Sequence, residues 1–573
     1  MIHATKRLGH VTERGAVALY DAASPSIPTD LPIGTWVELT VGTSEVRELA
    51  RPETALADTY IVAAAHKLTP YLPAPVEAEG QAWANSPGID DPSLTDLTQL
   101  PFVTIDEETS KDLDQAIVVE PTATGFTVWY AIADAAHYVR PGMALWDEAL
   151  ARGSTAYLPG LVVPMLPRIL SEDIISLNEG VDRRAVVFEM TLSSDGRCSG
   201  TVMHRARVHC RCKTWFDAVQ RYYDGGPCPS DDPAVAASLD HLQTIGEMRI
   251  RLAEERSMVS YRRRPLDIHL PSNTDARFVA LTAPRNAVER YNEQISILAN
   301  VEGAILLANA QDPDVQAIYR VHGAPPDAAI VRLRRQLAAF ARAHSLPKDI
   351  WEWDGKAPLA TWLEELPNGG RDGQLARAVH RMALMTNKRS TFQAEPDKHH
   401  GVGAPIYSRF TAPMREVVGI FVHKELCEHL GWASPNAPAD DERIRKTVIN
   451  ISHATRTRQS KLDRQMNRIV IDQLFESELD RPQSERTAYE ALVLGMSKDK
   501  VHVQLDIAPL DVKLYVSHVE AQLSKELHVD PSEIALRDKD GTAVVAIGDA
   551  ITVTALSLDT ERDRWKFHVE KVS

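Results

Sequence analysis

Three aspartates stand close together in one short loop of the sequence. The segment FVTIDEETSKDLDQAI (102–117) begins as an apolar strand that ends at Asp106, and Asp112 and Asp114 come just before the next apolar run. Residues two apart in an extended segment point the same way, so Asp112 and Asp114 can face one point, and the loop can bring Asp106 to them. Converging carboxylates repel one another unless a cation lies between them. Oxygen ligands favour Mg²⁺ or Mn²⁺, the ions that assist phosphodiester hydrolysis.

Two simpler explanations compete with a catalytic site at this loop. Aspartates bunch in solvated turns and in calcium-binding loops at least as often as in catalytic clusters. The loop lacks the glycine and the terminal glutamate of an EF-hand, which disfavours calcium. Taken alone, the loop leaves a solvated turn and a catalytic metal site open.

Length and composition indicate the kind of chain in which this loop lies. The chain has 573 residues, several times the usual domain size of roughly 150, so we expect several domains. Apolar residues make up 44% and charged residues 25%, which excludes a disordered or collagen-like chain. The net charge of −16 argues against a simple nucleic-acid coat. A nucleic-acid site must therefore be a local basic channel.

Cysteine usage and hydropathy indicate the cellular compartment in which the protein is expected. Five irregularly spaced cysteines predict no disulfide framework, and the single-residue gap between Cys210 and Cys212 is not typical of a zinc site, so a reducing cytoplasm fits best. We expect no signal peptide and no membrane span. The longest apolar stretch begins at Ile295, is interrupted by Asn300 and Glu302, and predicts a buried helix.

The pattern along the chain predicts an α+β architecture in five segments. Strands come first in the main domain and helices later, which is typical of that class. The expected segments are a small β-rich module (1–70), a proline-punctuated extended linker (71–100), the main domain (101–435), a basic helical segment that completes it (436–482), and a second β-rich domain (483–573).

Basic residues gather locally although the chain is acidic. Residues 442–468 predict a helix with eight Lys and Arg against two acids. A solvated helix face and a contact with a polyanion explain this run about equally well. Further clusters are Arg262, Arg263 and Arg264, and Arg205, Arg207, Arg211 and Lys213.

The C-terminal residues alternate as short strands do. The runs KVHVQLDI and KLYVSH are followed by AVVAIGDAITVTALSLD and WKFHVE, with a helical insert near Val519–Leu527. This pattern predicts a five-stranded OB barrel, a fold that commonly binds single-stranded nucleic acid.

The aspartate loop resembles the active-site loop of the ribonuclease II/ribonuclease R (RNB) exoribonucleases. Residues 130–192 are similar to the block that follows that loop, ERYNEQISILAN (289–300) resembles the family's glutamate-bearing helix, and 390–426 resembles the stretch with its catalytic arginine. The resemblance covers roughly 85–430, and the family also carries a terminal OB barrel. It implies an RNB catalytic domain, an antiparallel sheet covered by helices around a central RNA channel.

Carried over position by position, the resemblance implies catalytic or metal-binding roles for Asp106, Asp112 and Asp114, with Mg²⁺ as the cofactor and Mn²⁺ as a substitute. Gln115 replaces the family's fourth aspartate and can offer a metal only a neutral oxygen. Arg415 matches the arginine beside the scissile phosphate, where a guanidinium can stabilise developing charge.

Substrate contacts are implied in the same way. Tyr157 matches a tyrosine that stacks the 3′-terminal base. Glu293 matches one of a pair of glutamates near the end of the substrate, and Gln294 replaces the other. Arg409 and His137 lie in matching blocks, and we expect them to bind substrate, with a structural role as the alternative for His137.

The resemblance implies a 3′→5′ exoribonuclease that hydrolyses single-stranded RNA by a two-metal mechanism and releases 5′-nucleoside monophosphates, in RNA degradation or processing. The rivals are a catalytically impaired RNA-binding regulator, since Gln115 and Gln294 replace acids, and a DNA exonuclease. We expect a cytoplasmic monomer with no membrane contact and no obligatory protein partner.

The N-terminal module is expected to be reduced. Family members usually carry two cold-shock OB domains ahead of the catalytic block, whereas about 70 residues precede it here. One reduced OB-like module fits that length, and a helix-turn-helix is the alternative. A less enclosed entrance predicts better tolerance of structured RNA.

Overall fold

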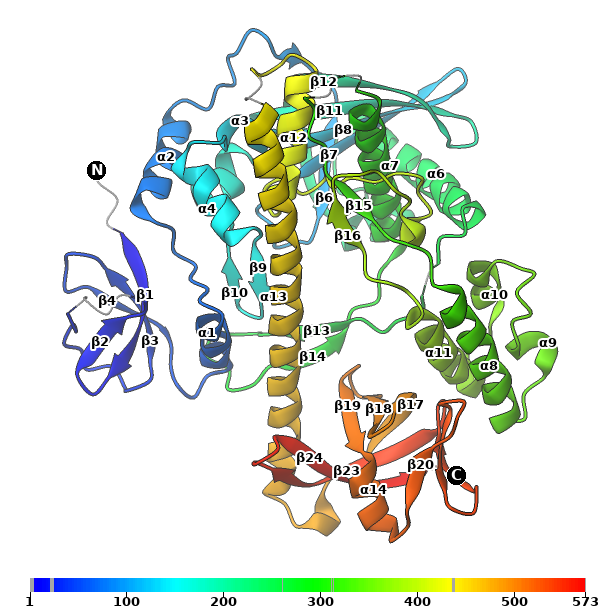
Figure 1. Ribbon diagram of the computed structural model, residues 1–573. Coiled ribbons are helices and arrows are strands. Elements are labelled where there is room, and N and C mark those ends of the chain that lie inside the picture. Colours follow the sequence, from blue (N-terminus) through cyan, green and yellow to red (C-terminus); the bar gives the residue numbers. More distant parts are fainter. Residues whose placement is uncertain are drawn as a thin grey trace.

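The computed structural model describes residues 5–20, 25–259, 261–310, 312, 314–434 and 438–571. Its elements form an N-terminal sheet, a central body built on a closed sheet, and a C-terminal sheet (Figure 1). One long helix joins the central body to the C-terminal sheet. Within the described residues, no helix is long and apolar enough to cross a membrane.

The N-terminal region is a four-stranded antiparallel sheet followed by one helix. The strands pair in the order β2-β1-β3-β4. Trp36 of the sheet stacks on Tyr60 of the helix with ring centroids 5.6 Å apart, so sheet and helix share a core. Between residues 5 and 65, outside the undescribed residues 21–24, α1 is the one helix, which does not support a helix-turn-helix. The bounds are β1 Lys6–Thr12, β2 Gly15–Ala18, β3 Trp36–Thr40, β4 Val46–Ala50 and α1 Ala55–Ala65.

The proline-punctuated segment after α1 contains a helix, although the sequence predicts an extended linker. Helix α2 (Ala74–Asn85) carries Pro75 in its first turn, where the missing N–H would have had no partner in any case. Glu79 of α2 accepts the N–H groups of Ala144 and Leu145 at 3.1 and 2.8 Å. These two residues begin α4 (Ala144–Arg152), so α2 is fastened to the central body.

Five strands of the central body close into a ring. They pair in the order β11-β8-β7-β6-β12, and β11 also pairs with β12. Strand β12 reaches both neighbours because it is 18 residues long, pairing antiparallel with β11 and parallel with β6, with an irregularity between Cys210 and Cys212. The bounds are β6 Phe102–Asp106, β7 Gln115–Thr122, β8 Gly125–Ala133, β11 Asp182–Ser193 and β12 Cys198–Trp215.

The predicted all-antiparallel sheet is wrong where β12 is concerned. Besides β6, the short strand β5 (Thr95–Asp96) pairs parallel with β12, so the sheet is mixed. The strand predicted to end at Asp106 is confirmed as β6. Strands also come first in this domain, as predicted. Parallel pairing depends on which distant segments meet, and alternation along one strand does not reveal it.

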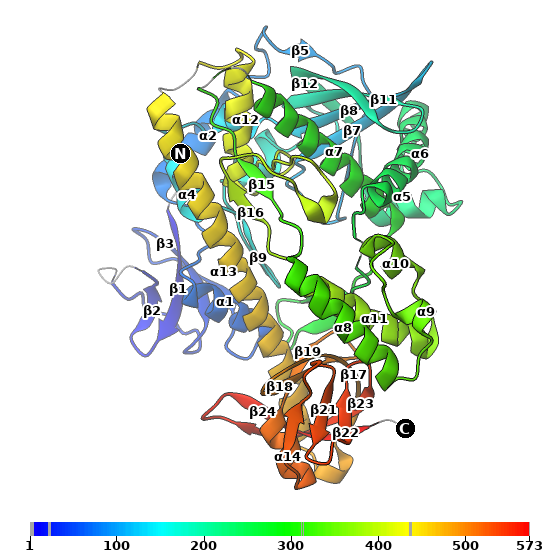
Figure 2. The same cartoon turned by 45° about the vertical axis from the view of Figure 1, so that its right-hand side comes forward.

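Helices cover the closed sheet. The predicted buried helix at Ile295 is confirmed as part of α7 (Ala287–Asn309), whose first turn is fixed by a capping box between Asn286 and Glu289. Helix α6 (Pro233–Glu255) lies beside α7 in both views, and α12 (Val417–His429) is almost wholly buried (Figures 1 and 2). The aspartate loop, between β6 and β7, therefore begins and ends at strands of the helix-covered sheet.

The remaining elements of the central body are short, apart from a helical group beside the C-terminal sheet (Figure 2). That group is α8 Asp327–Ala343, α9 Lys348–Trp351, α10 Leu359–Glu365 and α11 Gly370–Leu384. The short elements are α3 Ala135–Tyr138, β9 Ala156–Leu158, β10 Leu161–Val163, a π-helical turn Ile169–Ile174, α5 Phe216–Tyr223, β13 Leu266–His269, β14 Val279–Thr282, β15 Tyr319–Val321, β16 Thr391–Gln393 and a 3-10 turn His400–Val402.

A single helix of 42 residues, α13 (Pro438–Leu479), runs from beside α12 to the C-terminal sheet (Figure 1). It confirms the helix predicted over 442–468. Some of its basic side chains bond to other parts of the chain: Arg456 donates to the Ser390 carbonyl and Arg458 to the Arg152 carbonyl, both at 2.6 Å. The solvated-face explanation therefore does not hold for the whole run.

The C-terminal region holds five antiparallel strands in the order β19-β18-β17-β23-β24 and a separate three-stranded sheet, β20-β21-β22. A closed OB barrel is not confirmed by this pairing. The predicted insert Val519–Leu527 is displaced: α14 begins at Val516, and Leu527 lies in a strand. The bounds are β17 Tyr489–Ser497, β18 Lys500–Leu505, β19 Asp511–Tyr515, α14 Val516–Leu523, β20 Leu527–Val529, β21 Ala535–Asp538, β22 Ala543–Ala546, β23 Ala550–Asp559 and β24 Arg564–Lys571, after a 3-10 turn Gln483–Glu485.

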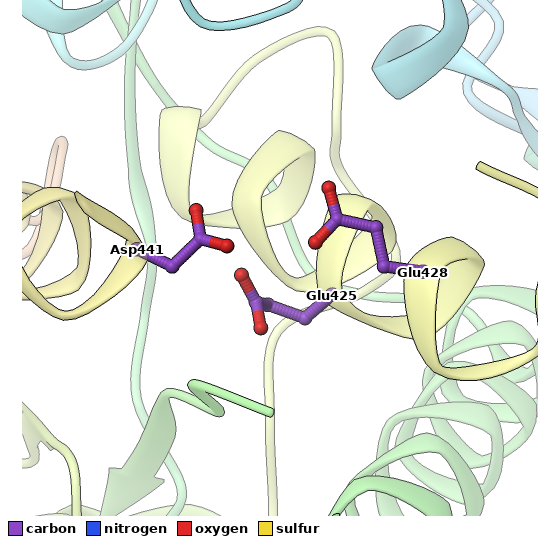
Figure 3. A group of neighbouring side chains, drawn as sticks. All are labelled: Glu425, Glu428 and Asp441. Atoms are coloured by element: carbon purple, nitrogen blue, oxygen red, sulfur yellow. The ribbon is translucent and has the colours of Figure 1, made fainter. Parts of the chain in front are cut away.

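A buried cluster of charges joins α12 to α13. Glu425 and Glu428 of α12 and Asp441 of α13 point toward one another (Figure 3). The Lys424 ammonium lies 3.0, 2.8 and 2.8 Å from their carboxylates. Three acids gathered like this could suggest a metal site, but the ammonium already supplies the cation. The cluster is accounted for as a structural joint.

We expect Lys424→Met to lower the free energy of unfolding by about 3–5 kcal/mol, because it removes the ammonium that contacts all three carboxylates. Lys446→Met is the matched control, since Lys446 pairs with Glu442 at the surface and such pairs contribute about 0–1 kcal/mol. Urea denaturation measures both. Equal losses in the two variants would contradict the joint.

Glu428 gives the joint a pH dependence. Burial raises the pKa of Glu428 from 4.5 to about 7, against the opposing effect of Lys424. The protonated form therefore stabilises the folded state below about pH 4.5, and this contribution is lost as the pH rises through about 7. We expect the wild type to lose stability relative to Glu428→Gln over that interval, measured by denaturation at a series of pH values. A difference that stays constant with pH would disprove this.

Candidate active site

Asp114 is the most buried member of the aspartate loop, with 1% of its surface exposed. Its Oδ1 accepts the N–H of Met414 at 3.0 Å, and its Oδ2 accepts from Nε of Arg415 at 2.6 Å. Burial raises the pKa of Asp114 to about 6, and Arg415 opposes that rise. A carboxylate removed from water in this way needs positive charge beside it.

Asp112 and Asp106 flank Asp114 on the same loop. The Tyr157 hydroxyl of β9 lies 3.4 Å from Oδ2 of Asp112, whose pKa is also raised by burial. Asp106, at the end of β6, accepts at Oδ1 from the Glu107 N–H at 2.8 Å and the Ser110 hydroxyl at 3.1 Å. The other Asp106 oxygen and the half-exposed Tyr157 ring remain available for a ligand.

The loop between Asp106 and Asp114 is held by contacts with the segment after the π-helical turn. The Ser176 hydroxyl accepts the N–H of Leu113 at 2.9 Å and donates to the Lys111 carbonyl at 2.8 Å. The N–H of Leu177 donates to the Leu113 carbonyl at 3.0 Å. The segment that contains Ser176 and Leu177 thereby holds the aspartate loop in position.

Gln115 does not join the aspartates. Its amide nitrogen donates to the Thr411 carbonyl at 2.9 Å, and its Oε1 accepts from the Tyr130 hydroxyl and from the Ser296 hydroxyl, the latter at 3.1 Å. Both ends of the amide are therefore engaged by β8, α7 and the segment before Arg415. An aspartate here could not donate to Thr411.

Arg415 and Arg409 lie on the wall of a cavity of about 370 Å³ beside the aspartates. The Arg415 backbone is fixed by the Thr155 N–H, which donates to its carbonyl at 2.9 Å. Arg409 pairs with Glu416 at 2.9 Å. The side chains on this wall that bear most on its chemistry are Tyr157, Arg320, Arg409, Arg415, Glu416 and Arg456. Four guanidinium groups against one glutamate make the cavity attractive to phosphate.

The donor set fits a hard divalent cation at Asp106, Asp112 and Asp114. All three carboxylates act on Arg415 through space, so one guanidinium faces three acids. Among the described residues, one group of three acids has ligand atoms that all lie within 4.8 Å of one another, and it is the group around Lys424. The ligand atoms of Asp106, Asp112 and Asp114 are therefore spread more widely. Their carboxylate oxygens are donors of the kind that Mg²⁺ prefers, and Mg²⁺ typically completes its coordination with waters and phosphate oxygens.

Two predicted substrate residues lie outside this constellation. His137 of α3 contacts Arg140 and Arg205 at 3.1 and 3.4 Å, and burial lowers its pKa to about 3, which supports its structural alternative. Glu293 of α7 forms an ion pair with Arg285 at 3.2 Å. Neither residue lines the cavity beside the aspartates.

Asn300 is a positioning residue that the sequence reasoning missed. Its Oδ1 accepts the N–H groups of Phe410 and Thr411 at 2.6 and 3.3 Å. Its amide nitrogen donates to the hydroxyls of Tyr407 and Thr411 at 3.1 and 3.0 Å. Asn300 interrupts an apolar helix in the sequence, and a fully buried amide at such a position was the signal that could have revealed it. Arg320, also missed, has no sequence signal of its own, whereas Arg456 belongs to the basic run 442–468.

Comparisons with known proteins identify the family of the main domain. Residues 94–431 match the RNB domain. Ribonuclease R of Escherichia coli is 31% identical over 334 residues, 58% of this chain and 40% of the relative. Exoribonuclease 2 of Aeromonas hydrophila is 29% identical over 386 residues, 66% of this chain and 54% of the relative. The chain thus matches about half or less of each relative's length.

Solved structures extend the likeness in fold. RNase R of Mycoplasma genitalium, in complex with ribose-methylated single-stranded RNA, superposes with a TM-score of 0.82 at 20% identity, covering 99% of this chain and 90% of that one. Yeast Ssd1, a pseudonuclease, gives a TM-score of 0.61 at 14% identity, covering 97% and 68%. At these identities the likeness is one of fold. This chain belongs to the RNB family.

We expect Asn300→Ala to lower the free energy of unfolding by about 3 kcal/mol, because it leaves buried N–H and hydroxyl groups without partners. Asn309→Ala, at the exposed end of the same helix, is the control and should change stability by less than about 0.5 kcal/mol. Thermal and urea unfolding measure both. A loss below about 1 kcal/mol for Asn300→Ala would show that the segment before Arg415 is held by other contacts.

Proposed function

We propose that this protein is a metal-dependent exoribonuclease that shortens single-stranded RNA from its 3′ end and releases 5′-nucleoside monophosphates. The observation that carries the proposal is the buried Asp114–Arg415 pair, with Asp106, Asp112 and Tyr157 beside one arginine-lined cavity in an RNB chain. Each group has a distinct part in that reaction.

Mg²⁺ or Mn²⁺ held on Asp106, Asp112 and Asp114 would supply an activated water and neutralise charge on the phosphate. Arg415 lines the cavity while its Nε is fixed on Asp114, so its guanidinium can stabilise charge that develops on a phosphate oxygen. The two-metal mechanism needs ligands for a second ion, and Gln115, engaged elsewhere, does not contribute one.

The Tyr157 ring would stack on a base at the end of the strand, a role that its 45% exposure beside Asp112 supports. Arg409 and Arg456 extend the wall on which the next phosphates would lie. In the same proposal the C-terminal strands belong to an RNA-binding OB-type domain, and the N-terminal sheet to a reduced module at the entrance.

The decisive experiment incubates the protein with 5′-labelled single-stranded RNA and a matched DNA, with Mg²⁺, with Mn²⁺ and with chelator. We expect stepwise shortening of the RNA from its 3′ end, lost with chelator and in Asp114→Asn. Asp195→Asn, a change of the same kind in an exposed surface pair, should remain as active as the wild type. Shortening of the DNA at the same rate would contradict an RNA-specific enzyme.

An RNA-binding protein without hydrolysis is the second candidate, favoured by the commitment of Gln115 to structural partners. Intact RNA that is retarded on a native gel, with Mg²⁺ and with Mn²⁺, would establish it and overturn the exoribonuclease.

We expect Tyr157→Ala to raise KM for RNA by about 5- to 150-fold, since stacking on one base contributes about 1–3 kcal/mol. Tyr157→Phe keeps the ring and loses the weak hydroxyl contact with Asp112, so its KM should stay within about threefold of the wild type. Steady-state kinetics on one RNA measure both. Equal losses in the two variants would assign the role to the hydroxyl and contradict stacking.

A further inference from the structure

Five arginines line one cavity away from the aspartates. The cavity, of about 170 Å³, lies where the segment before β13, helix α11, α13 and the strands β17 to β19 meet. The arginines are Arg262, Arg263, Arg264, Arg377 and Arg381. We refer to it below as the arginine pocket.

The acids around the arginine pocket do not balance its charge. Arg264 and Arg377 share Asp506, at 3.3 and 3.4 Å, and Arg381 pairs with Asp511 at 3.5 Å. Two carboxylates therefore serve three of the five guanidinium groups.

Arg262 and Arg263 have no ion pair within the described residues. Arg262 donates to the carbonyls of Glu364, Leu366 and Pro367 at 2.7–2.8 Å, which fixes its position, and the Glu364 carboxylate acts on it only through space. Arg263 lies over the Tyr261 ring at 5.9 Å.

Partial loss of water around the guanidinium groups adds to the imbalance, although Arg263 as a whole stays exposed. The pKa of Arg263 is lowered first by burial and then by repulsion from Arg381. Burial likewise lowers the pKa of Arg262 and Arg264. Guanidinium groups that lose water without gaining enough negative charge favour an anionic ligand, and phosphate matches their planar donor geometry.

The arginine pocket lies in line with the candidate active site along α13. Asn467 of α13 lines the arginine pocket, and Arg456 of the same helix lines the cavity beside the aspartates. Eleven residues separate them, which is about three helical turns, or about 16 Å, and returns to the same helix face. A chain that follows this face of α13 passes both places.

We propose that the arginine pocket binds a phosphodiester group of the RNA strand whose 3′ end occupies the aspartate site. The proposal rests on the proposed function, since it supposes that RNA is the substrate. The pocket then holds the strand upstream of the reacting bond, and its effect depends on RNA length: a short oligomer ends before the pocket and a long one reaches it.

The test measures binding in chelator, so that no RNA is degraded, with single-stranded RNA oligomers of increasing length. The variants are Arg263→Gln and Arg263→Gln/Arg381→Gln. The control is Arg443→Gln/Lys446→Gln, which removes the same charge from the exposed beginning of α13. Thermal unfolding of every variant verifies that it folds, and Arg263→Gln, which breaks no ion pair, provides the second reading if the double variant does not.

We expect the double variant to bind long RNA about tenfold more weakly and short RNA as the wild type does. The dependence of log K on log salt should become shallower by about 0.7, since the pocket binds one phosphate group and each lost phosphate contact removes about 0.7. The control variant should keep both values. Equal weakening by the control, or weakening that does not depend on RNA length, would overturn the proposal.

A free nucleotide is the other source of a phosphate group. If 5′-AMP binds the wild type and not the double variant while RNA binding stays the same in both, the pocket holds mononucleotides and the strand assignment is wrong. The failure of the proposed function is distinguishable, because a wild type that binds RNA but does not shorten it with Mg²⁺ leaves the measurements in chelator intact.

Discussion

Asp114 and Arg415 are 301 residues apart in the sequence, and a 2.6 Å ion pair joins them in the interior. A carboxylate with 1% exposure would be costly without that partner, so the loop after β6 and the segment before α12 must meet for either to be stable. Asn300 holds the arginine segment from one side, and Ser176 holds the aspartate loop from the other. Asn300 belongs to helix α7, and Ser176 follows the π-helical turn, so both contacts come from elements outside the loop and the arginine segment.

Positive and negative charges are unevenly distributed in this acidic chain. Positive charge is concentrated on the walls of two cavities: Arg320, Arg409 and Arg456 line one, and Arg263 and Arg381 line the other. The net charge of −16 therefore describes the whole surface and not the cavities. A polyanion repelled at long range can still be attracted locally, because low-dielectric walls focus the field of the charges that line them.

Much of the fold followed from local pattern. The strand before Asp106, the buried helix around Ile295 and the basic helix over 442–468 could be predicted, because alternation, apolar periodicity and charge are properties of contiguous residues. The helix at Ala74–Asn85 could have been, since a proline in the first turn is tolerated, but the number of prolines favoured an extended segment. The orientation of Gln115 could not be predicted: it depends on Ser296, 181 residues away, and on the Thr411 carbonyl. The parallel pairing of β12 depends equally on distant segments.

Strand β12 also bears on how this fold can vary in length. Its first part pairs with β11 and its last residues pair with β6, so its 18 residues set two registers at once. Inserting or deleting one residue would shift one of them and turn the side chains of that half to the opposite face of the sheet. The hairpin tip between β11 and β12 and the surface loops do not set two registers. Changes of length should therefore accumulate at those tips and leave β12 itself at constant length.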